Sequence, residues 1–127
     1  MVTHAQVTSL RPYERVRAII VGVSDYANDK IADLPFADDD AEYFAQMLRE
    51  QSEWPVAPAD IVLLTEQDAT YARSIAALSK LTDSASPRDR VLIFSARHGD
   101  LLVVSAIPTR YLLLHYAPAR AYAAGAP

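Results

Sequence analysis

The sequence predicts an α/β domain built on a mostly parallel β-sheet. Three short apolar segments rich in branched residues, at 16–23, 60–65 and 90–95, have the composition of strands that are buried on both faces. Two amphipathic segments, at 38–51 and 70–83, separate them and have the spacing of helices. Strands that alternate with helices in this way form parallel sheets with right-handed crossovers.

The first predicted helix begins with three consecutive carboxylates and carries one apolar face. Asp38, Asp39 and Asp40 stand in its first turn, where acidic side chains cap free backbone N–H groups and interact favourably with the helix dipole. Neighbouring helix residues point about 100° apart, so these three do not form one chelating face. We therefore predict capping residues and no metal site. The apolar positions that follow are Ala41, Phe44 and Leu48.

The second predicted helix follows Thr70, a residue type that is favoured as an N-cap. Its inner face is expected to hold Tyr71, Ile75 and Leu78, which are spaced by four and three residues. A Ser-Ala-Ser-Pro segment at 84–87 ends the helix before the third strand.

Outside this alternating pattern the sequence is less regular. Residues 1–14 are predicted to form a flexible lead-in without the apolar core of a signal peptide, so a cytoplasmic location is expected. Residues 15–127 are predicted to form one partial domain. Beyond Asp100 the segment at 111–116 is a candidate fourth strand.

Composition excludes several classes of function. A chain of 127 residues is long enough for one core. Its 12 Lys and Arg against 16 Asp and Glu exclude a broad basic surface for nucleic acid. No apolar run approaches the roughly 20 residues of a membrane span. The absence of cysteine excludes disulfides, thiolate zinc sites and a thiol nucleophile within this chain.

Candidate functional residues stand where the predicted strands end, because sites in open α/β sheets form at the carboxyl ends of strands. Ser24, Asp25 and Tyr26 follow the first strand, and His98 and Gly99 follow the third. An imidazole can transfer protons near neutral pH, and a glycine lets a backbone N–H approach a developing oxyanion. A surface loop with a chance histidine is the alternative.

Four segments, taken in order, resemble the caspase-like and metacaspase-like cysteine peptidases. They are the strand at 18–23 followed by Asp25-Tyr26, the segment Leu-Pro-Phe-Ala-Asp-Asp-Asp-Ala-Glu at 34–42, the segment 61–64 followed by Asp68-Ala69-Thr70, and the strand at 91–94 that leads to His98-Gly99-Asp100. The resemblance covers about residues 15–100. It implies a caspase-like three-layer sandwich with a mostly parallel sheet, incomplete at its C-terminal side.

The resemblance also implies an activity, cysteine-type endopeptidase, and roles for particular residues. His98 corresponds to the catalytic histidine and Gly99 to the donor of an oxyanion-hole N–H, while Asp25 is a candidate for the substrate-binding site. The implied partner is a protein or peptide substrate. The family also implies that calcium could bind, although no ligand can be assigned, and no other cofactor is expected.

The sequence departs from the family pattern in two ways. Ala96 and Arg97 stand where the family has serine and glycine, and the cation of Arg97 should disfavour the imidazolium form of His98. The family's cysteine lies about 50 residues after the histidine, near position ~148 by that spacing. The chain has no cysteine, so we expect that it does not hydrolyse peptides as written, and we expect self-association through an exposed sheet edge.

Other interpretations stay open. The chain could be a catalytically dead caspase-fold module that binds a protein partner, one half of a split enzyme whose cysteine lies on a second chain, or a truncated or frame-disrupted remnant. A receiver-type domain matches poorly, because Ser24-Asp25 and His98 stand where a receiver has an acid pair and a phospho-acceptor aspartate.

Overall fold

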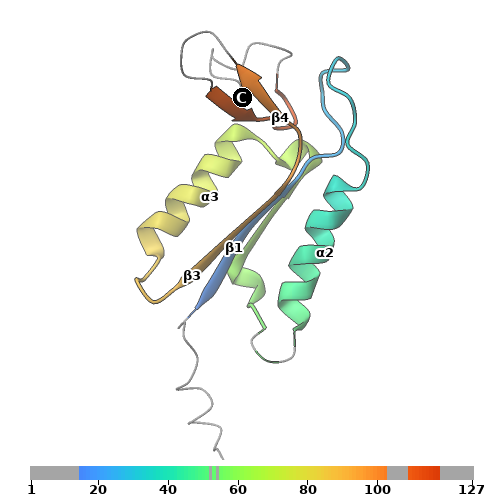
Figure 1. Cartoon of the computed structure of the whole chain (residues 1–127). Helices are drawn as coiled ribbons and strands as arrows, with labels where there is room; N and C mark the ends of the chain where they lie inside the picture. The colour runs from blue at the N-terminus through green and yellow to red at the C-terminus, as the bar shows by residue number, and fades with distance from the viewer. Residues whose placement is uncertain (1–14, 52, 54, 103–108, 118–127) are drawn as a thin grey trace, which may run out of the picture.

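A computed structural model describes residues 15–51, 53, 55–102 and 109–117 of the chain (Figure 1). Its centre is a three-stranded, fully parallel sheet in the order β2-β1-β3. The strands are β1 (Val16–Gly22), β2 (Ile61–Thr65) and β3 (Arg90–Ala96). The α/β class and the parallel sheet predicted from the sequence are therefore confirmed.

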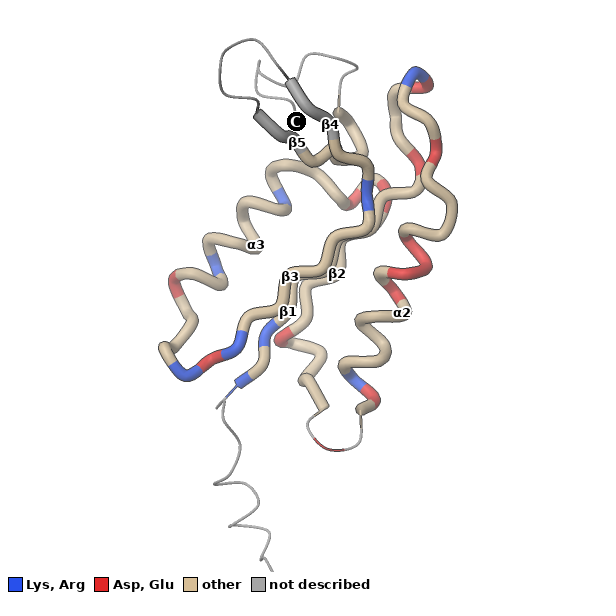
Figure 2. The backbone as a smooth tube through the Cα atoms, viewed as in Figure 1, with Lys and Arg blue, Asp and Glu red and all other residues tan. Residues whose placement is uncertain are grey.

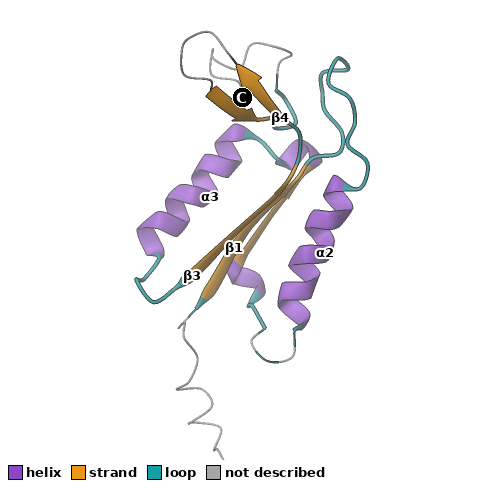
Figure 3. Ribbon diagram, viewed as in Figure 1, coloured by secondary structure: helices purple, strands orange, loops and turns teal. Residues whose placement is uncertain are grey.

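Two helices lie on opposite faces of the sheet (Figure 3). They are α2 (Ala37–Glu50) and α3 (Tyr71–Ser84), and each connects one parallel strand to the next. Short 3₁₀ turns, η1 (Pro58–Asp60) and η2 (Glu66–Asp68), flank β2. The result is three layers, helix on sheet on helix, within the described residues. Neither helix there has the length and apolarity that a membrane span requires.

The core on the α2 face is closely packed. The rings of Phe44 and Phe94 stack with centroids 4.7 Å apart, which joins the helix to β3. The predicted apolar face of the helix is confirmed, since Ala41 and Leu48 are buried and Phe44 packs against them. The buried members of this cluster are Ala18, Ile20, Ala41, Ala45, Leu48 and Val56.

Gly22 allows α2 to approach the end of β1. A Cβ atom at this position would lie 2.5 Å from the carbonyl oxygen of Ala37 and 2.6 Å from the Cβ of Ala41. Both distances are shorter than van der Waals contact, and one of the two atoms belongs to the backbone. The first turn of α2 therefore rests directly on the carboxyl end of β1, beside the loops that form the candidate site.

The prediction for α3 is confirmed at its start and wrong for its inner face. Thr70 is the N-cap, and its hydroxyl accepts a 3.1 Å hydrogen bond from the N–H of Arg73. However, the residues predicted to face inward are exposed, and the helix packs through Ala77 and Leu81 instead. The three exposed residues are Tyr71, Ile75 and Leu78. Two apolar stripes overlap on this helix, and the spacing alone did not distinguish which one meets the sheet.

The chain after His98 forms a separate two-stranded sheet. Strands β4 (Gly99–Leu102) and β5 (Thr109–Leu112) pair antiparallel, with Gly99 opposite Leu112. The candidate fourth strand at 111–116 was thus wrong in extent, since β5 ends at Leu112 and does not join the parallel sheet. The predicted lead-in at 1–14 lies outside the described residues.

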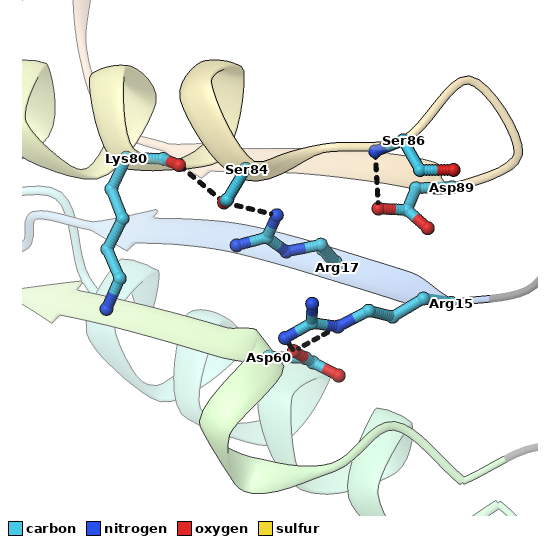
Figure 4. A network of polar contacts seen from close by, with 7 residues as sticks. All are labelled: Arg15, Arg17, Asp60, Lys80, Ser84, Ser86 and Asp89. Carbon is cyan, nitrogen blue, oxygen red and sulfur yellow. Dashed lines mark hydrogen bonds and ion pairs between the residues drawn. The ribbon is translucent and has the colours of Figure 1, made fainter.

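Polar contacts link the amino-terminal end of β1 to the last residue of η1 and to the carboxyl-terminal end of α3 (Figure 4). Arg15 Nε donates to Asp60 Oδ1 at 2.8 Å, and this contact raises the pKa of Arg15 above its usual value. The neighbouring Arg17 is buried, and its Nη1 donates to Ser84 Oγ at 2.7 Å. Ser84 Oγ in turn donates to the carbonyl of Lys80 at 2.6 Å. These contacts hold the edge of the sheet opposite to the candidate site.

Candidate active site

The loops that follow the three parallel strands meet at one edge of the sheet. Acidic residues gather on the loop before α2 and on its first turns, whereas basic residues gather at the opposite edge of the sheet (Figure 2). His98 lies at the acidic edge, two residues after the end of β3. This is the position at which open parallel sheets form their sites.

His98 is held from both its backbone and its ring. Its N–H donates to the hydroxyl of Tyr26 at 2.8 Å, and the Tyr26 and His98 rings lie with centroids 5.4 Å apart. Its Nε2 lies 2.9 Å from the carbonyl oxygen of Ala32. Because a carbonyl oxygen can only accept, Nε2 carries the proton in this contact, and Nδ1 of the neutral ring is left as the acceptor. The loop after β1 thus determines which nitrogen of His98 can act as a base.

Burial changes the acidity of two groups beside this histidine, Tyr26 and Arg97. Burial raises the pKa of Tyr26, and the hydrogen bond from His98 opposes that rise. Burial lowers the pKa of Arg97, and the nearby Tyr26 opposes that fall. The Nε of Arg97 is buried and has no hydrogen-bond partner among the described residues. The predicted cation beside His98 is therefore partly desolvated rather than extended into solvent.

Gly99 begins β4 in a position that leaves its N–H outside the hairpin ladder. The N–H of Leu113 donates to the carbonyl of His98 at 2.9 Å. Antiparallel ladders alternate between hydrogen-bonded and non-hydrogen-bonded pairs, so the next pair, Gly99 with Leu112, is non-hydrogen-bonded. The Gly99 N–H therefore points away from β5, as an oxyanion donor requires.

Glu66 fixes the loop that follows β1. Its two carboxylate oxygens accept from the N–H groups of Ser24, at 2.8 Å, and Asp25, at 3.0 Å. Glu66 itself has a φ of 51°, a left-handed conformation that is uncommon for a residue with a side chain. Glu66 stands directly after β2, and the sequence did not predict this contact because it joins residues 42 positions apart.

The candidate residue Asp25 lies at the same edge and is exposed. Its carbonyl is 2.6 Å from Nδ1 of His115, and the carbonyl of His115 accepts from the N–H of Ala27 at 2.8 Å. His115 also donates its N–H to the carbonyl of Ala69 at 3.2 Å. The segment around His115 thus joins the loops after β1 and β2, a role that sequence reasoning did not predict.

The three consecutive carboxylates lie in the first turn of α2, as predicted, but none of them is the N-cap residue. The N-cap is Phe36, in a left-handed conformation with φ of 69°, and its own side chain makes no capping hydrogen bond. Instead, the Ser24 hydroxyl accepts from the N–H of Asp38 at 3.1 Å and donates to its Oδ1 at 2.7 Å. This hydroxyl contact lowers the pKa of Asp38. The loop after β1 brings Ser24 to the first turn of α2. A sequence pattern of neighbouring residues cannot predict this contact, because it joins positions 14 apart.

Within the described ranges, no group of three or more histidine, aspartate or glutamate side chains is placed to bind a metal ion. The arrangement instead provides an oriented imidazole and, next to it, a backbone N–H that is free of the hairpin ladder. A base and an oxyanion donor are two of the three parts of a nucleophilic acyl-transfer site, and the nucleophile is the third. The chain contains no cysteine that could serve as that nucleophile.

No model of a known protein family matches the sequence, and no curated protein matches it significantly.

Proposed function

We propose that this chain is a caspase-like domain that supplies the histidine side of a cysteine-endopeptidase site. The observation that carries the proposal is the 2.9 Å contact between His98 Nε2 and the carbonyl of Ala32. In nucleophilic catalysis the base is itself oriented by a third group, and a backbone carbonyl performs that task here. Nδ1 is then directed to receive a proton.

The reaction would need a cysteine from outside the 127 residues. Nδ1 of His98 would take the thiol proton as the sulfur attacks the peptide carbonyl, and the N–H of Gly99 would stabilise the oxyanion. The protonated imidazole would then give its proton to the departing amine, and the acyl-enzyme would be hydrolysed by water. The outer edge of β3, which has no neighbouring strand in the described structure, is adjacent to His98 and could receive the strand that carries this thiol.

A second candidate is an inactive caspase-like module that binds a protein partner. The partly buried Arg97 favours it, because a long side chain stands there in place of the glycine that the resembled family has before its histidine. The absence of cysteine agrees with both candidates, so composition does not distinguish them.

A thiol-reactive peptide probe distinguishes the two. The tagged chain is recovered from the cells that express it, together with any bound partner, and treated with peptidyl acyloxymethyl ketones that carry Arg, Lys or Asp at the cleaved position. The endopeptidase proposal predicts a labelled cysteine on a partner chain. It also predicts that His98→Ala abolishes labelling while the partner still co-purifies. Labelling that is unchanged in this variant, or no labelled partner, would contradict the proposal.

The purified chain provides the control. Fluorogenic peptides with the same three residues, with and without calcium, should show no turnover, because a base without a nucleophile does not cleave amides. Turnover by the purified chain would show that the site contains a nucleophile other than cysteine.

A further inference from the structure

The outer edge of β3 carries free backbone groups in the described structure. The N–H of Arg90 donates to the carbonyl of Arg15, and the carbonyl of Ala96 accepts from Val23, each at 2.9 Å. The even-numbered residues of β3 therefore bond to β1. Because the direction of the backbone groups alternates along a strand, the groups of the intervening residues point to the open edge. These residues are Val91, Ile93 and Ser95.

The side chains of the same three residues are exposed on one face of the sheet. Ile93 is paired with Ile19, a member of the core cluster beneath α3, so Val91, Ile93 and Ser95 lie on the α3 side of the sheet. Ile93 is nevertheless 66% exposed, and Val91 and Ser95 are exposed as well. By contrast, Leu92 and Phe94 on the opposite face pack against the α2 core.

Helix α3 extends this apolar surface. Its packing residues Ala77 and Leu81 contact the core, and the exposed stripe of Tyr71, Ile75 and Leu78 lies about 100° further round the helix. In a right-handed crossover from β2 to β3, that side of the helix faces β3. The strand edge and the helix stripe thus lie on the same side of the sheet. Together we call them the β3–α3 surface, composed of the exposed residues Tyr71, Ile75, Leu78, Val91 and Ile93.

We propose that a second copy of this chain covers the β3–α3 surface by pairing β3 with β3 in antiparallel orientation. A two-fold axis perpendicular to the sheet makes two edge strands antiparallel and keeps both α3 helices on the same face. With the axis at Ile93, Ile93 lies opposite its own copy, and Val91 lies opposite Ser95 of the second copy. In this register the backbone groups of Val91, Ile93 and Ser95 all have a partner on the second copy. A shift by one pair in either direction leaves some of these backbone groups without a hydrogen-bond partner.

Charge supports the same register. If the same register continues by one pair beyond each end of β3, Asp89 lies opposite Arg97 of the second copy. The two-fold axis produces this pair twice, once on each side. Arg97 is partly buried with an Nε that lacks a hydrogen-bond partner among the described residues, so an approaching carboxylate would meet an unsatisfied donor. β3 also lacks the lysine, proline or bulge with which edge strands resist pairing.

This inference does not depend on the proposed function. A strand that carries a nucleophile would need the same edge, so the dimer would be the form without a peptidase site. Probe labelling can therefore fail while the dimer exists, and the dimer can be absent while labelling succeeds.

Because the chain has no cysteine, single introduced thiols test the register directly. We expect Ile93→Cys to form a covalent dimer with a short thiol-to-thiol cross-linker. Ser95→Cys is the matched control on the same strand and face, and it should not cross-link to itself. A mixture of the Val91→Cys and Ser95→Cys chains should cross-link. Cross-linking of Ser95→Cys alone, or none of Ile93→Cys, would overturn the proposal.

Self-association provides an independent measurement. Ile93→Lys should weaken dimerisation at least about tenfold in sedimentation equilibrium, because it places two like charges at the centre of the interface. Circular dichroism checks that this variant folds, which is expected for a side chain that is already exposed. Tyr43→Lys, on the outer surface of α2, should leave dimerisation unchanged. A wild-type chain that is monomeric at high micromolar concentration would refute the dimer.

Discussion

The hydroxyl of Tyr26 accepts a 2.8 Å hydrogen bond from the backbone N–H of His98, across 72 positions of sequence. Tyr26 is only 7% exposed and belongs to the core cluster beneath α3. The contact therefore anchors the loop after β3 to the core. The position of the candidate base depends on the same packing that stabilises the fold.

Removing this hydroxyl should destabilise the protein and loosen His98. Tyr26→Phe keeps the ring but leaves the His98 N–H without its acceptor, so the free energy of unfolding should fall by about 1–2 kcal/mol. Urea denaturation measures the loss, and hydrogen exchange should show reduced protection of the His98 amide. Tyr43→Phe, at an exposed position, should have little effect. Equal stability of Tyr26→Phe and wild type would contradict the structure.

The ring of His98 should be found in a single neutral tautomer. Its Nε2 donates to the carbonyl of Ala32, so the proton of the neutral ring should reside on Nε2 and not on Nδ1. Long-range ¹H–¹⁵N correlation spectra of the neutral ring distinguish the two nitrogens. A ring protonated on Nδ1 would refute the orientation on which the proposed function depends.

Adding one methyl group at Gly22 should disrupt the contact between β1 and α2. The new Cβ of Gly22→Ala would overlap the carbonyl of Ala37 and the Cβ of Ala41. Overpacking of this kind costs about 1–3 kcal/mol, and the shifted helix should change the chemical shifts of Ser24 and Asp38. Glu42→Ala, at an exposed position of α2, serves as the control in the same denaturation series. Tolerance of Gly22→Ala with unchanged shifts would count against the close approach.

Ser24 should make stability depend on acid pH. Its hydroxyl lowers the pKa of Asp38 in the folded state, so the stabilisation is present above the unfolded carboxyl value of about 3.9 and is lost as the pH falls through the lower folded value. Denaturation midpoints should show wild type more stable than Ser24→Ala at pH 7, with the difference shrinking below about pH 4.

A matched hydroxyl elsewhere controls that experiment. Thr82→Ala removes a hydroxyl that donates to the carbonyl of Leu78, which does not titrate. Its effect on the midpoint should be the same at every pH at which the protein folds. A pH-independent effect of Ser24→Ala would show that Asp38 does not contribute through its charge.

Much of the fold could be predicted because its signals are local. The branched apolar segment around Ile20 identified a buried strand, and the spacing of Ala41 and Leu48 identified the face of α2. Thr70 could be assigned as a cap because capping involves residues three positions apart. The predicted inner face of α3 was wrong. Two overlapping stripes of apolar residues both have helical spacing, and only the packing of the helix on the sheet determines which stripe is buried.

The position of the candidate site could be predicted from the sequence, but the contacts that orient its side chains could not. His98 and Asp25 follow strands whose parallel order places them at one edge, so the sequence alone determined the class of fold and the edge at which a site can form. Only the tertiary structure decided that Ala32 orients the imidazole, that Ser24 binds the first turn of α2, and that β3 has one neighbouring strand among the described residues. Periodicity reports neighbours a few positions apart, whereas these contacts join loops whose approach depends on how the whole sheet packs.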